Sequence, residues 1–484
     1  MATVNTNDLR IKNAKNLIGS FNRGPIANSY VFVGRVQPWA DDNLPTPPQN
    51  NNREFYRTYD DMFALSRIGT NDSYHMINKI KWVSGVTYDI YQHNYTSVNR
   101  SFTGASNLYD SRFFVLNSQN SVYVCLDNNN NTTSTVEPLA DGDDVFYTSD
   151  GYQWLRLYNI LDDILKTRST DNLMPVAVTR GNTKTDGAIY TTLIDNGGSL
   201  FTVNPAGANN QISAYYAHIE GDGTGAVAKV SITNSVVSKI EMARNGSGYT
   251  FGTLEFTSGN VYQSLSDLDL GVNGLNPEGD GNLRTTSVIS PPGGWGSDIV
   301  RQLGGTRVGV FSSLNYPLFV DYYPCPFRQV GILQDFDYQG ANPSSLNACY
   351  AVRLIGIETG ESFIIGESIE QEVTVNGVPK IAKGTVISWN ASFGVLRYVQ
   401  NSDDVDSDGQ LYRFSGDNNV IGKTSTLVGI PYSFDGEMTG MTFDDGYANS
   451  NLTKYTGYMT YLSNISPIAR DPQQSERVSL VIAF

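Results

Sequence analysis

The stretch GYMTYLSNISPIARDPQQSERVSLVIAF, residues Gly457–Phe484, decides how this chain folds. Large apolar residues stand at every second position from Val478 to Phe484, with Ser479, Val481 and Ala483 between them. A period of two indicates a strand that turns one face to a core. Because chain ends normally fray, an apolar strand here predicts an integral strand of the main sheet. We therefore expect two strands joined by a polar turn, and unfolding when the last strand is removed.

The composition of the chain favours strands and turns. Among 484 residues, 40% are hydrophobic, 46 are glycine, and the 29 tyrosines outnumber the 21 phenylalanines. Val, Thr, Tyr and Gly in quantity are typical of sheets and turns rather than of helices. A chain of this length can bury a large core and form two or three domains.

The charge balance argues against nucleic acids and membranes as partners. Charged residues make up 17% of the chain, and the formal net charge is −15. Such a surface repels phosphates and acidic lipid headgroups alike. No run reaches the roughly 18 apolar residues that a membrane span needs, and no basic and apolar leader follows Met1. We expect a soluble protein that is made in the cytoplasm.

Cysteine usage indicates the same compartment. The chain has three cysteines, Cys125, Cys325 and Cys349, and no CxxC spacing. An odd and sparse set predicts neither a disulfide framework nor a zinc site. Folding in a reducing cytoplasm is the simplest interpretation.

Two segments carry helical signals. Thr58 to Ile68 starts with residues that cap helices and continues with apolar bulk. Gly151 to Thr167 has the clearest pattern, with apolar residues spaced i, i+3, i+4, i+7 and i+8 from Leu157. By contrast, Arg112 to Asp127 alternates around a polar turn and predicts a hairpin. The residues alone therefore predict a mainly β protein with two short helices.

The C-terminal stretch also carries a family resemblance. Its order of Tyr-Leu, Ser-Asn, Ile-Ser-Pro-Ile, Arg-Asp, Gln and Glu before a strand ending in Phe resembles the C-terminus of the dimeric baseplate wedge proteins of T-even-type contractile-tailed bacteriophages. Further patches follow in the order of that family, and together they cover about half of the chain. They are VFVGRVQPWADDN (Val31–Asn43), IKWVSGVTYD (Ile80–Asp89), VYVCLDNN (Val122–Asn129), SDGYQWLRLYNI (Ser149–Ile160), LMPVAV (Leu173–Val178), PPGGWGSDIVRQLGGTRV (Pro291–Val308) and FRQVGILQD (Phe327–Asp335).

The resemblance implies a fold, partners and a role. It implies a layered β-sandwich core with two short helices and inserted small β domains, assembled as a homodimer that contacts other baseplate wedge proteins. The expected role is mechanical: a stiff block of the virion that moves as a body when the baseplate rearranges and the sheath contracts. Assembly would take place in the bacterial host cytoplasm. Such a role needs no turnover, cofactor, metal or small-molecule substrate.

Two segments have no counterpart in the family and lengthen the chain. The first contains GDGTGA and GSGYT, and it resembles a small β module inserted in many tailed-phage virion proteins. The second contains GVPKIAKGTVISWNASFGVLRYV, a strand-turn-strand pattern. We predict residues 1–181 as the N-terminal part of the core, 182–280 as the inserted module, 281–359 as the core continuation, 360–451 as the second β insertion and 452–484 as the C-terminal core strands.

Two patterns that carry chemistry in other proteins are incomplete here. Gly221, Gly223 and Gly225 form a GxGxG, but a strand rhythm follows instead of the helix that a dinucleotide site requires, so we interpret them as a tight turn. Asp404, Asp406, Asp408 and Gly409 open like a calcium loop, but Ser415 stands where the closing glutamate belongs. A polar turn is the favoured interpretation, and a weak surface calcium site is the open alternative.

Histidines and acidic pairs supply no catalytic constellation. The three histidines lack metal-binding spacing, and we interpret them as ordinary surface or loop residues. Adjacent acids are interpreted as solvated turn residues, because a glycosidase pair would need a geometry that sequence does not show. The residues are His75, His93 and His218, and the pairs Asp41-Asp42, Asp60-Asp61 and Asp143-Asp144. The sequence thus predicts no catalytic, cofactor-binding or metal-binding residue.

Aromatic residues offer interface material. Five tryptophans and many tyrosines supply rigid contact area of the kind enriched in interface cores, although packing inside a sheet is the favoured interpretation for any single tryptophan. They are Trp39, Trp82, Trp154, Trp295 and Trp389, of which Trp39 is interpreted as a packing lid on a loop. Two rival functions stay open: a receptor-binding or fibre-like virion protein, and a β-sandwich polysaccharide-degrading enzyme.

Overall fold

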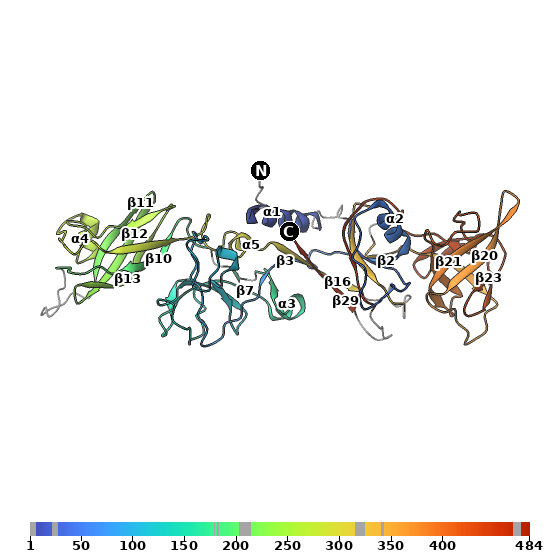
Figure 1. Ribbon diagram of the computed structural model, residues 1–484, viewed down its shortest axis with the longest axis horizontal. Coiled ribbons are helices and arrows are strands. Elements are labelled where there is room, and N and C mark those ends of the chain that lie inside the picture. The colour runs from blue at the N-terminus through green and yellow to red at the C-terminus, as the bar shows by residue number, and fades with distance from the viewer. Residues whose placement is uncertain are drawn as a thin grey trace. The chain divides into compact units, whose positions relative to one another are not determined.

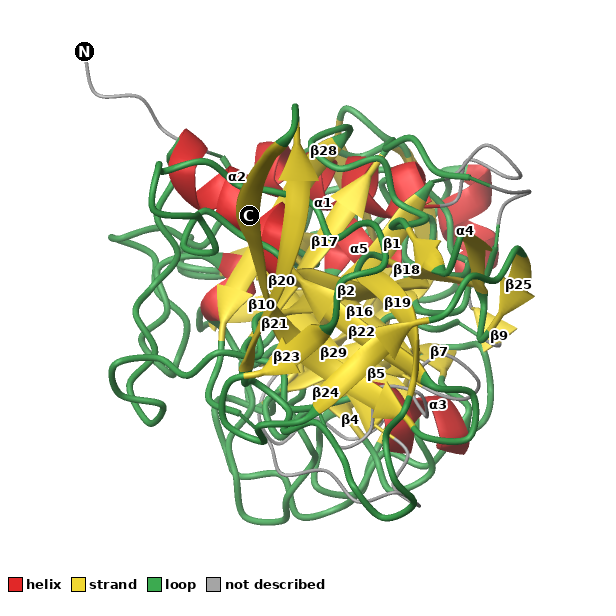
Figure 2. Ribbon diagram, turned by 90° about the vertical axis from the view of Figure 1, so that its right-hand side faces the viewer, coloured by secondary structure: helices red, strands yellow, loops and turns green. Residues whose placement is uncertain are grey.

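The computed structural model describes residues 6–21, 28–178, 180–181, 183–202, 214–314, 325–339, 343–467 and 476–484. Strands in several sheets make up most of its regular structure, with few helices among them (Figure 2). The predicted mainly β class is therefore confirmed. The described residues hold five α-helices where two were predicted: Asn7–Phe21 (α1), Asn52–Asp61 (α2), Asp162–Arg168 (α3), Leu265–Leu270 (α4) and Ile299–Gln302 (α5). Within the described ranges, no helix combines the length and apolar character of a membrane span.

The chain divides into two compact units, each assembled from separate pieces of sequence. The first unit contains Met1–Lys15, Tyr74–Gly309 and Ile482–Phe484, and the second contains Asn16–Ser73 and Val310–Val481. The chain passes between the units at four points, and each point lies inside a regular element. These elements are α1, β3 (Ser73–Asn78), β16 (Arg307–Leu314) and β29 (Glu476–Ala483). The three strands form one sheet with β8 (Leu173–Pro175), in the order β29-β16-β3-β8.

The C-terminal stretch forms two strands, as predicted. In β29, Val478 and Leu480 are buried while Ser479 is exposed, which confirms the period of two. The preceding strand, β28 (Tyr458–Asn464), belongs to a different sheet. The predicted polar turn includes residues 468–475, which lie outside the described residues.

A five-stranded sheet forms the centre of the first unit. Its order is β4-β5-β7-β6, with β9 paired to β7, and β4 with β5 is the hairpin predicted between Arg112 and Asp127. In the core, the rings of Tyr91 and Trp295 pack edge to face with centroids 4.5 Å apart. The strands are Phe114–Leu116 (β4), Ser121–Asp127 (β5), Phe146–Tyr147 (β6), Gln153–Asn159 (β7) and Arg180–Gly181 (β9), and a 3-10 turn spans Leu108–Asp110.

The helix predicted from Gly151 to Thr167 is wrong over its first half. Gln153–Asn159 forms β7, and α3 begins only at Asp162. Every residue of β7 except the last is buried, so its apolar residues do not alternate along the strand. The apparent helical spacing arises where this doubly covered strand joins a short helix.

The helix predicted from Thr58 to Ile68 starts earlier than expected. α2 begins after Asn51, whose Oδ1 accepts the backbone N–H of Glu54 at 2.9 Å. The apolar residues that suggested a helix instead form β2 (Met62–Arg67), whose first four residues are buried. Since these four consecutive residues point to both faces of the sheet, both faces are covered there and the apolar residues do not alternate.

Strands β10 (Ile189–Asn196) and β15 (Arg284–Ile289) pair antiparallel in a two-stranded sheet. The segment between them builds a separate four-stranded sheet. Its order is β13-β12-β11-β14, and Figure 1 shows β11, β12 and β13 side by side. A separate apolar core lies against it. The strands are Tyr215–Gly221 (β11), Thr224–Thr233 (β12), Val236–Ser247 (β13) and Gly252–Leu254 (β14).

In the second unit, a five-stranded sheet has the order β18-β2-β1-β17-β28. Its core includes Tyr30, Tyr59 and Phe336, and the rings of Tyr30 and Phe336 lie 5.2 Å apart. Gly331 lies opposite Phe32 in the register of β1 and β17, and an added Cβ would collide with the Phe32 ring and the Tyr461 carbonyl oxygen. The remaining strands are Ser29–Gly34 (β1), Gln329–Gln334 (β17) and Ser345–Asn347 (β18).

We expect Gly331→Ala to lower the free energy of unfolding by about 1–3 kcal/mol, because the methyl group overpacks a rigid sheet. Thermal unfolding followed by circular dichroism measures the loss. Gly19→Ala is the matched control: it lies in α1 with open space around it, and alanine there stabilises a helix by about 0.5–1 kcal/mol. Equal melting temperatures for the wild type and Gly331→Ala would contradict the packing described here.

After β18 the chain leaves this sheet and forms a closed barrel. Its six strands pair in the ring β22-β21-β20-β23-β24-β19, and β19 pairs back to β22. The chain returns at Asn451, whose N–H donates to the Asn347 carbonyl at 2.9 Å. The barrel strands are Tyr350–Ile355 (β19), Ser368–Val375 (β20), Val378–Asn390 (β21), Val395–Val399 (β22), Val420–Gly422 (β23) and Val428–Pro431 (β24), followed by Gly436–Met438 (β25), Met441–Asp444 (β26) and Tyr447–Ala448 (β27).

Candidate functional site

A buried cluster of charged and polar residues joins the barrel to the five-stranded sheet of the second unit. Asp61, at the end of α2, accepts a hydrogen bond from Asn401 Nδ2 at 2.7 Å. Arg57 Nε lies 3.6 Å and Arg35 Nη1 lies 3.9 Å from the same carboxylate. Arg57 also pairs with Asp403 at 2.6 Å. Asn401 and Asp403 follow β22 of the barrel, so these five residues, the Asp61 cluster, hold the two parts together.

Burial has the largest effect on the pKa of Asp61. The Asp61 residue is only 4% exposed, and burial raises its pKa. The hydrogen bond from Asn401 and the charges of Arg57 and Arg35 act in the opposite direction on that pKa. A largely buried carboxylate that accepts a hydrogen bond from Asn401 and faces two guanidinium groups has a structural role, because its removal would leave buried polar groups without this partner.

Lys454 forms a second buried pair in the same joint. Its Nζ lies 3.7 Å from Asp60 Oδ1 and 4.8 Å from the centroid of the Tyr350 ring. Burial lowers the pKa of Lys454 to about 8, against the raising effect of Asp60. Tyr455 Oη donates to the same Asp60 oxygen at 2.6 Å. A lowered lysine pKa occurs in nucleophilic lysines, but the ammonium group here faces a carboxylate that it neutralises.

Asp404 makes the joint sensitive to pH. Burial raises the pKa of its carboxyl to about 6; the charges of Asp61 and Asp403 add to this, while the Asn401 N–H, at 2.9 Å, and Lys383 oppose it. The folded pKa of Asp404 exceeds the unfolded value of about 3.9, so the neutral carboxyl favours the folded state. Its contribution to the free energy of unfolding is fully present below about pH 3.9 and is lost as the pH rises through about 6.

We expect Asp404→Asn to raise the free energy of unfolding at about pH 7.5 by up to about 3 kcal/mol, and to leave it unchanged near pH 4. Asparagine keeps an oxygen for the Asn401 N–H and removes the buried charge. Thermal melts across pH measure the difference. Asp406→Asn, on the same loop but less buried, is the control, and a gain at pH 7.5 from both variants alike would rule out Asp404 as the source.

The interpretation of the acidic pairs as solvated turn residues is wrong for Asp60 and Asp61, which both lie largely buried in the joint. Asp42 is bonded to a buried arginine, whereas Asp143 is about half exposed and stays consistent with a solvated turn. Asp61 belongs to the buried cluster, Asp42 accepts two hydrogen bonds from Arg328 at 2.8 and 2.7 Å, and Asp143 pairs with Arg156. Arg328 and Arg156 are buried, and hydrogen bonding to Arg328 lowers the pKa of Asp42 to about 2. Arg328 directly precedes β17 and Arg156 lies in β7, and the folded chain brings each of these arginines to its acid.

The Asp404–Asp408 loop does not form a converging set of ligands. Asp404 is buried against Asn401, whereas Asp408 pairs with Lys380 at 2.6 Å and accepts from Tyr412 Oη at 2.7 Å. The hydrogen bond from Lys380 lowers the pKa of Asp408 to about 2. Across the described ranges, no three His, Cys, Asp or Glu side chains group as metal ligands would. The polar-turn interpretation therefore fits this loop.

The glycine pattern lies in a hairpin, as predicted. Gly221 ends β11 and Gly225 lies in β12, with a positive φ of 80°. A strand follows, so a helix N-terminus that could bind a pyrophosphate is lacking at this turn. The hairpin borders an open pocket where Glu220 and Glu255 share a hydrogen bond, which with burial raises the Glu255 pKa. Two carboxyls in direct contact are closer than the roughly 5 Å used by retaining glycosidases.

Histidines and cysteines occupy separate places. His75 lies in β3 and is half-buried, and burial lowers its pKa to about 4, so it is not the surface residue that was predicted. His93 lies in a loop and His218 in β11. Cys125, Cys325 and Cys349 are buried.

The tryptophans pack within the described structure. Trp154 and Trp295 are fully buried, and Trp39, Trp82 and Trp389 are partly buried. The Arg35 guanidinium lies 3.8 Å from the Trp39 ring centroid, and the Trp39 indole N–H donates to the Ile465 carbonyl at 3.1 Å. Trp39 is therefore a packing lid, as predicted. Sheet packing, rather than display at a surface, accounts for these residues.

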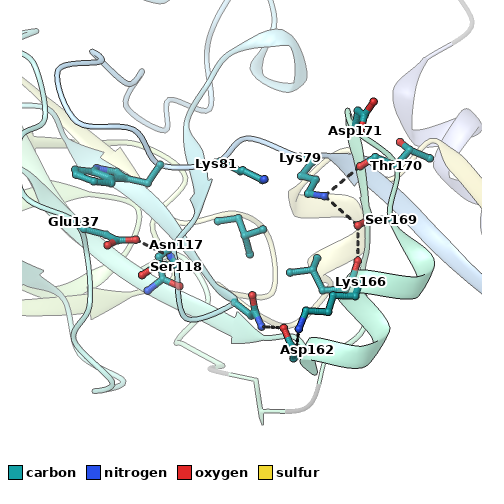
Figure 3. Close-up of a pocket in the computed structure, with 14 residues that line it drawn as sticks. Lys79, Lys81, Asn117, Ser118, Glu137, Asp162, Lys166, Ser169, Thr170 and Asp171 are labelled. Atoms are coloured by element: carbon teal, nitrogen blue, oxygen red, sulfur yellow. Dashed lines mark hydrogen bonds and ion pairs between the residues drawn. The ribbon is translucent and has the colours of Figure 1, made fainter.

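A polar pocket of about 590 Å³ lies beside α3 in the first unit (Figure 3). Lys79 Nζ donates to Ser169 Oγ at 3.1 Å and to the Thr170 carbonyl at 3.2 Å. Lys166 pairs with Asp162 at 2.5 Å on the helix. These charged groups bond to the wall of the pocket, and the lining residues provide no base placed beside a nucleophile. Of the lining residues, sequence analysis singled out Trp82 alone, as an aromatic residue and not as part of a pocket, because the lining is spread over four separate segments.

Comparison with models of known protein families and with curated proteins finds no match to this chain.

Proposed function

We propose that this protein is a structural component of a phage tail baseplate wedge, present as a homodimer that links neighbouring wedge proteins. The observation that carries the proposal is where the family-like patches lie. Most of them coincide with paired strands of the two units, including β1, β5, β7, β17, β28 and β29, whereas Ile80–Asp89 lies outside the named strands. The two segments without a counterpart instead build the four-stranded sheet and five of the six barrel strands, β20 to β24, while the sixth, β19, lies before the predicted boundary at residue 360. A shared framework with added modules is the arrangement expected of an enlarged family member.

The internal contacts suit a mechanical role. The Arg328–Asp42 pair and the hydrogen bond from Asn401 to Asp61 connect segments that are 286 and 340 residues apart in the sequence. Removing one partner of a paired buried charge costs several kcal/mol. Such contacts keep a block stiff when it moves as a body. In this proposal the protein works through interfaces in the virion and needs no cofactor, and it is assembled in the bacterial host cytoplasm.

Antibody labelling of purified virions, viewed by electron microscopy, tests the proposal. We expect label confined to the distal end of a contractile tail. Label along a fibre would favour the receptor-binding alternative. Absence from intact particles, with the protein only in the lysate, would overturn the proposal, and a screen for glycan hydrolysis would then test the enzyme alternative. Antibody against the capsid of the same particles controls for access of the label.

A further inference from the structure

One outer face of the barrel is aliphatic where a solvent-facing sheet is normally polar. Strands β23, β24 and β19 are neighbours in the ring. Ile421 lies directly opposite Val428, and Ile430 directly opposite Ile355. These four side chains are 43–45% exposed. Because Val428 and Ile430 are two residues apart on one strand, the four form a continuous patch, which we call the barrel face.

The side chains of the barrel face are not needed to fill the interior of the barrel. The intervening residues Val420 and Leu354 point inward and are buried, and Gly429 lies against Leu354. The interior is therefore complete without the barrel face. Contiguous exposed aliphatic side chains on a folded domain indicate a contact with another molecule.

An aromatic and arginine group extends the barrel face at one end. Tyr432 follows Ile430 by two residues, and its N–H donates to the Arg353 carbonyl at 2.9 Å. The Arg353 guanidinium lies 4.6 Å from the Tyr432 ring centroid and 4.8 Å from that of Phe434. Tyrosine and arginine beside aliphatic residues are the composition enriched at protein interface centres.

The charge around the barrel face defines the partner. Residues 350–448 contain 14 acidic and six basic residues, a net charge of −8 within the −15 of the whole chain. Glu370, directly opposite Ile421, and Glu372 lie on one border, and Asp435 follows Phe434 on the other. Lys423 is paired with Glu370 at 2.8 Å, so these two charges offset each other and Glu372 and Asp435 give the border its acidic character. An acidic border attracts a basic partner and repels a second copy of the same acidic surface.

We propose that the barrel face binds a different polypeptide, through a segment whose aliphatic side chains are flanked by lysine and arginine. The inference rests on the proposed function as an assembly protein and names the chemistry of one partner. The strands of the closed ring already have a neighbour on each side, so the contact is made by side chains rather than by an added strand.

Photo-crosslinking in assembled particles tests the proposal. Ile430→benzoylphenylalanine places the probe in the barrel face, and Val378→benzoylphenylalanine, 50% exposed elsewhere on the same barrel, is the matched control. We expect Ile430 but not Val378 to cross-link a different polypeptide, at a segment with more Lys and Arg than Asp and Glu. A cross-link to a second copy, to an acidic segment, or at no higher yield than Val378 would overturn the inference.

Two variants that place opposite charges at position 430 give an independent test. Both Ile430→Lys and Ile430→Glu remove the aliphatic contact, but only lysine repels a basic partner. We expect Ile430→Lys to lower incorporation into particles about tenfold more than Ile430→Glu, with melting temperatures equal for the two. Equal incorporation, or a larger loss for Ile430→Glu, would overturn the inference while leaving a particle-associated wild type consistent with the proposed function. A wild type absent from particles would overturn both.

Discussion

Leu480→Asp is expected to lower the free energy of unfolding by about 3–5 kcal/mol, whereas Ser479→Asp is expected to leave it within about 0.5 kcal/mol. Leu480 is 7% exposed and Ser479 is exposed on the other side of β29. The first substitution removes buried apolar volume and places a carboxyl in its position. The second places the same carboxyl in water. Thermal and urea unfolding of the two variants measure the contrast directly.

Removal of residues 476–484 extends the same test. It takes away a whole strand of the sheet β29-β16-β3-β8 together with the hydrogen bond from the Phe484 N–H to the Thr306 carbonyl at 3.1 Å. We expect the shortened chain to lose its cooperative melting transition. Retention of a wild-type transition by the truncated chain, or equal losses for Leu480→Asp and Ser479→Asp, would show that this strand is not part of the core.

Trp154→Ala is expected to cost about 3–5 kcal/mol. Trp154 is fully buried in β7, opposite Cys125 of β5 and Phe146 of β6. Its ring stacks on Tyr152, with centroids 5.5 Å apart and planes at 17°. Alanine leaves a cavity that these strands cannot fill without moving. Differential scanning calorimetry measures the loss.

Trp154→Phe is the matched variant. Within the described structure, the buried Trp154 indole N–H finds no hydrogen-bond partner. Phenylalanine removes that unpaired donor while it keeps an aromatic ring beside Tyr152, so we expect a loss smaller than about 1.5 kcal/mol. A loss as large as that of alanine would show that the indole has a bonding role the geometry does not indicate.

Sequence analysis succeeded where alternation or a polar turn marks the element, even in β4 and β5, which are buried along nearly their whole length. The alternation in β29 and the hairpin of β4 and β5 follow from a period of two and a polar turn, both local features. It failed for β7 and β2, which read as helices because burial on both sides removes the alternation. Helix α2 was misplaced because Asn51, not a residue near Thr58, accepts the first free N–H group.

The candidate sites likewise divide into features that adjacent residues reveal and features that only the folded chain brings together. That the glycine pattern is a turn, and that Asp404–Asp408 lacks a closing glutamate, could be read from adjacent residues. The Arg–Asp pairs could not, because Asp42 and Arg328 are 286 residues apart in the sequence. The closing of the barrel by β19 and β22 likewise depends on pairing between segments that no local pattern connects, and the barrel face exists only once those strands are neighbours.

The four points at which the chain passes between the units limit how its gene can recombine with a related gene. A gene exchange that replaced one unit would have to join two parental sequences inside α1, β3, β16 and β29, and each junction would need matching packing on both sides. The segment between β10 and β15, and the one between Asn347 and Asn451, leave and return at neighbouring residues, so a single cassette can replace either. Related genes should therefore diverge by trading these cassettes while the two units descend together.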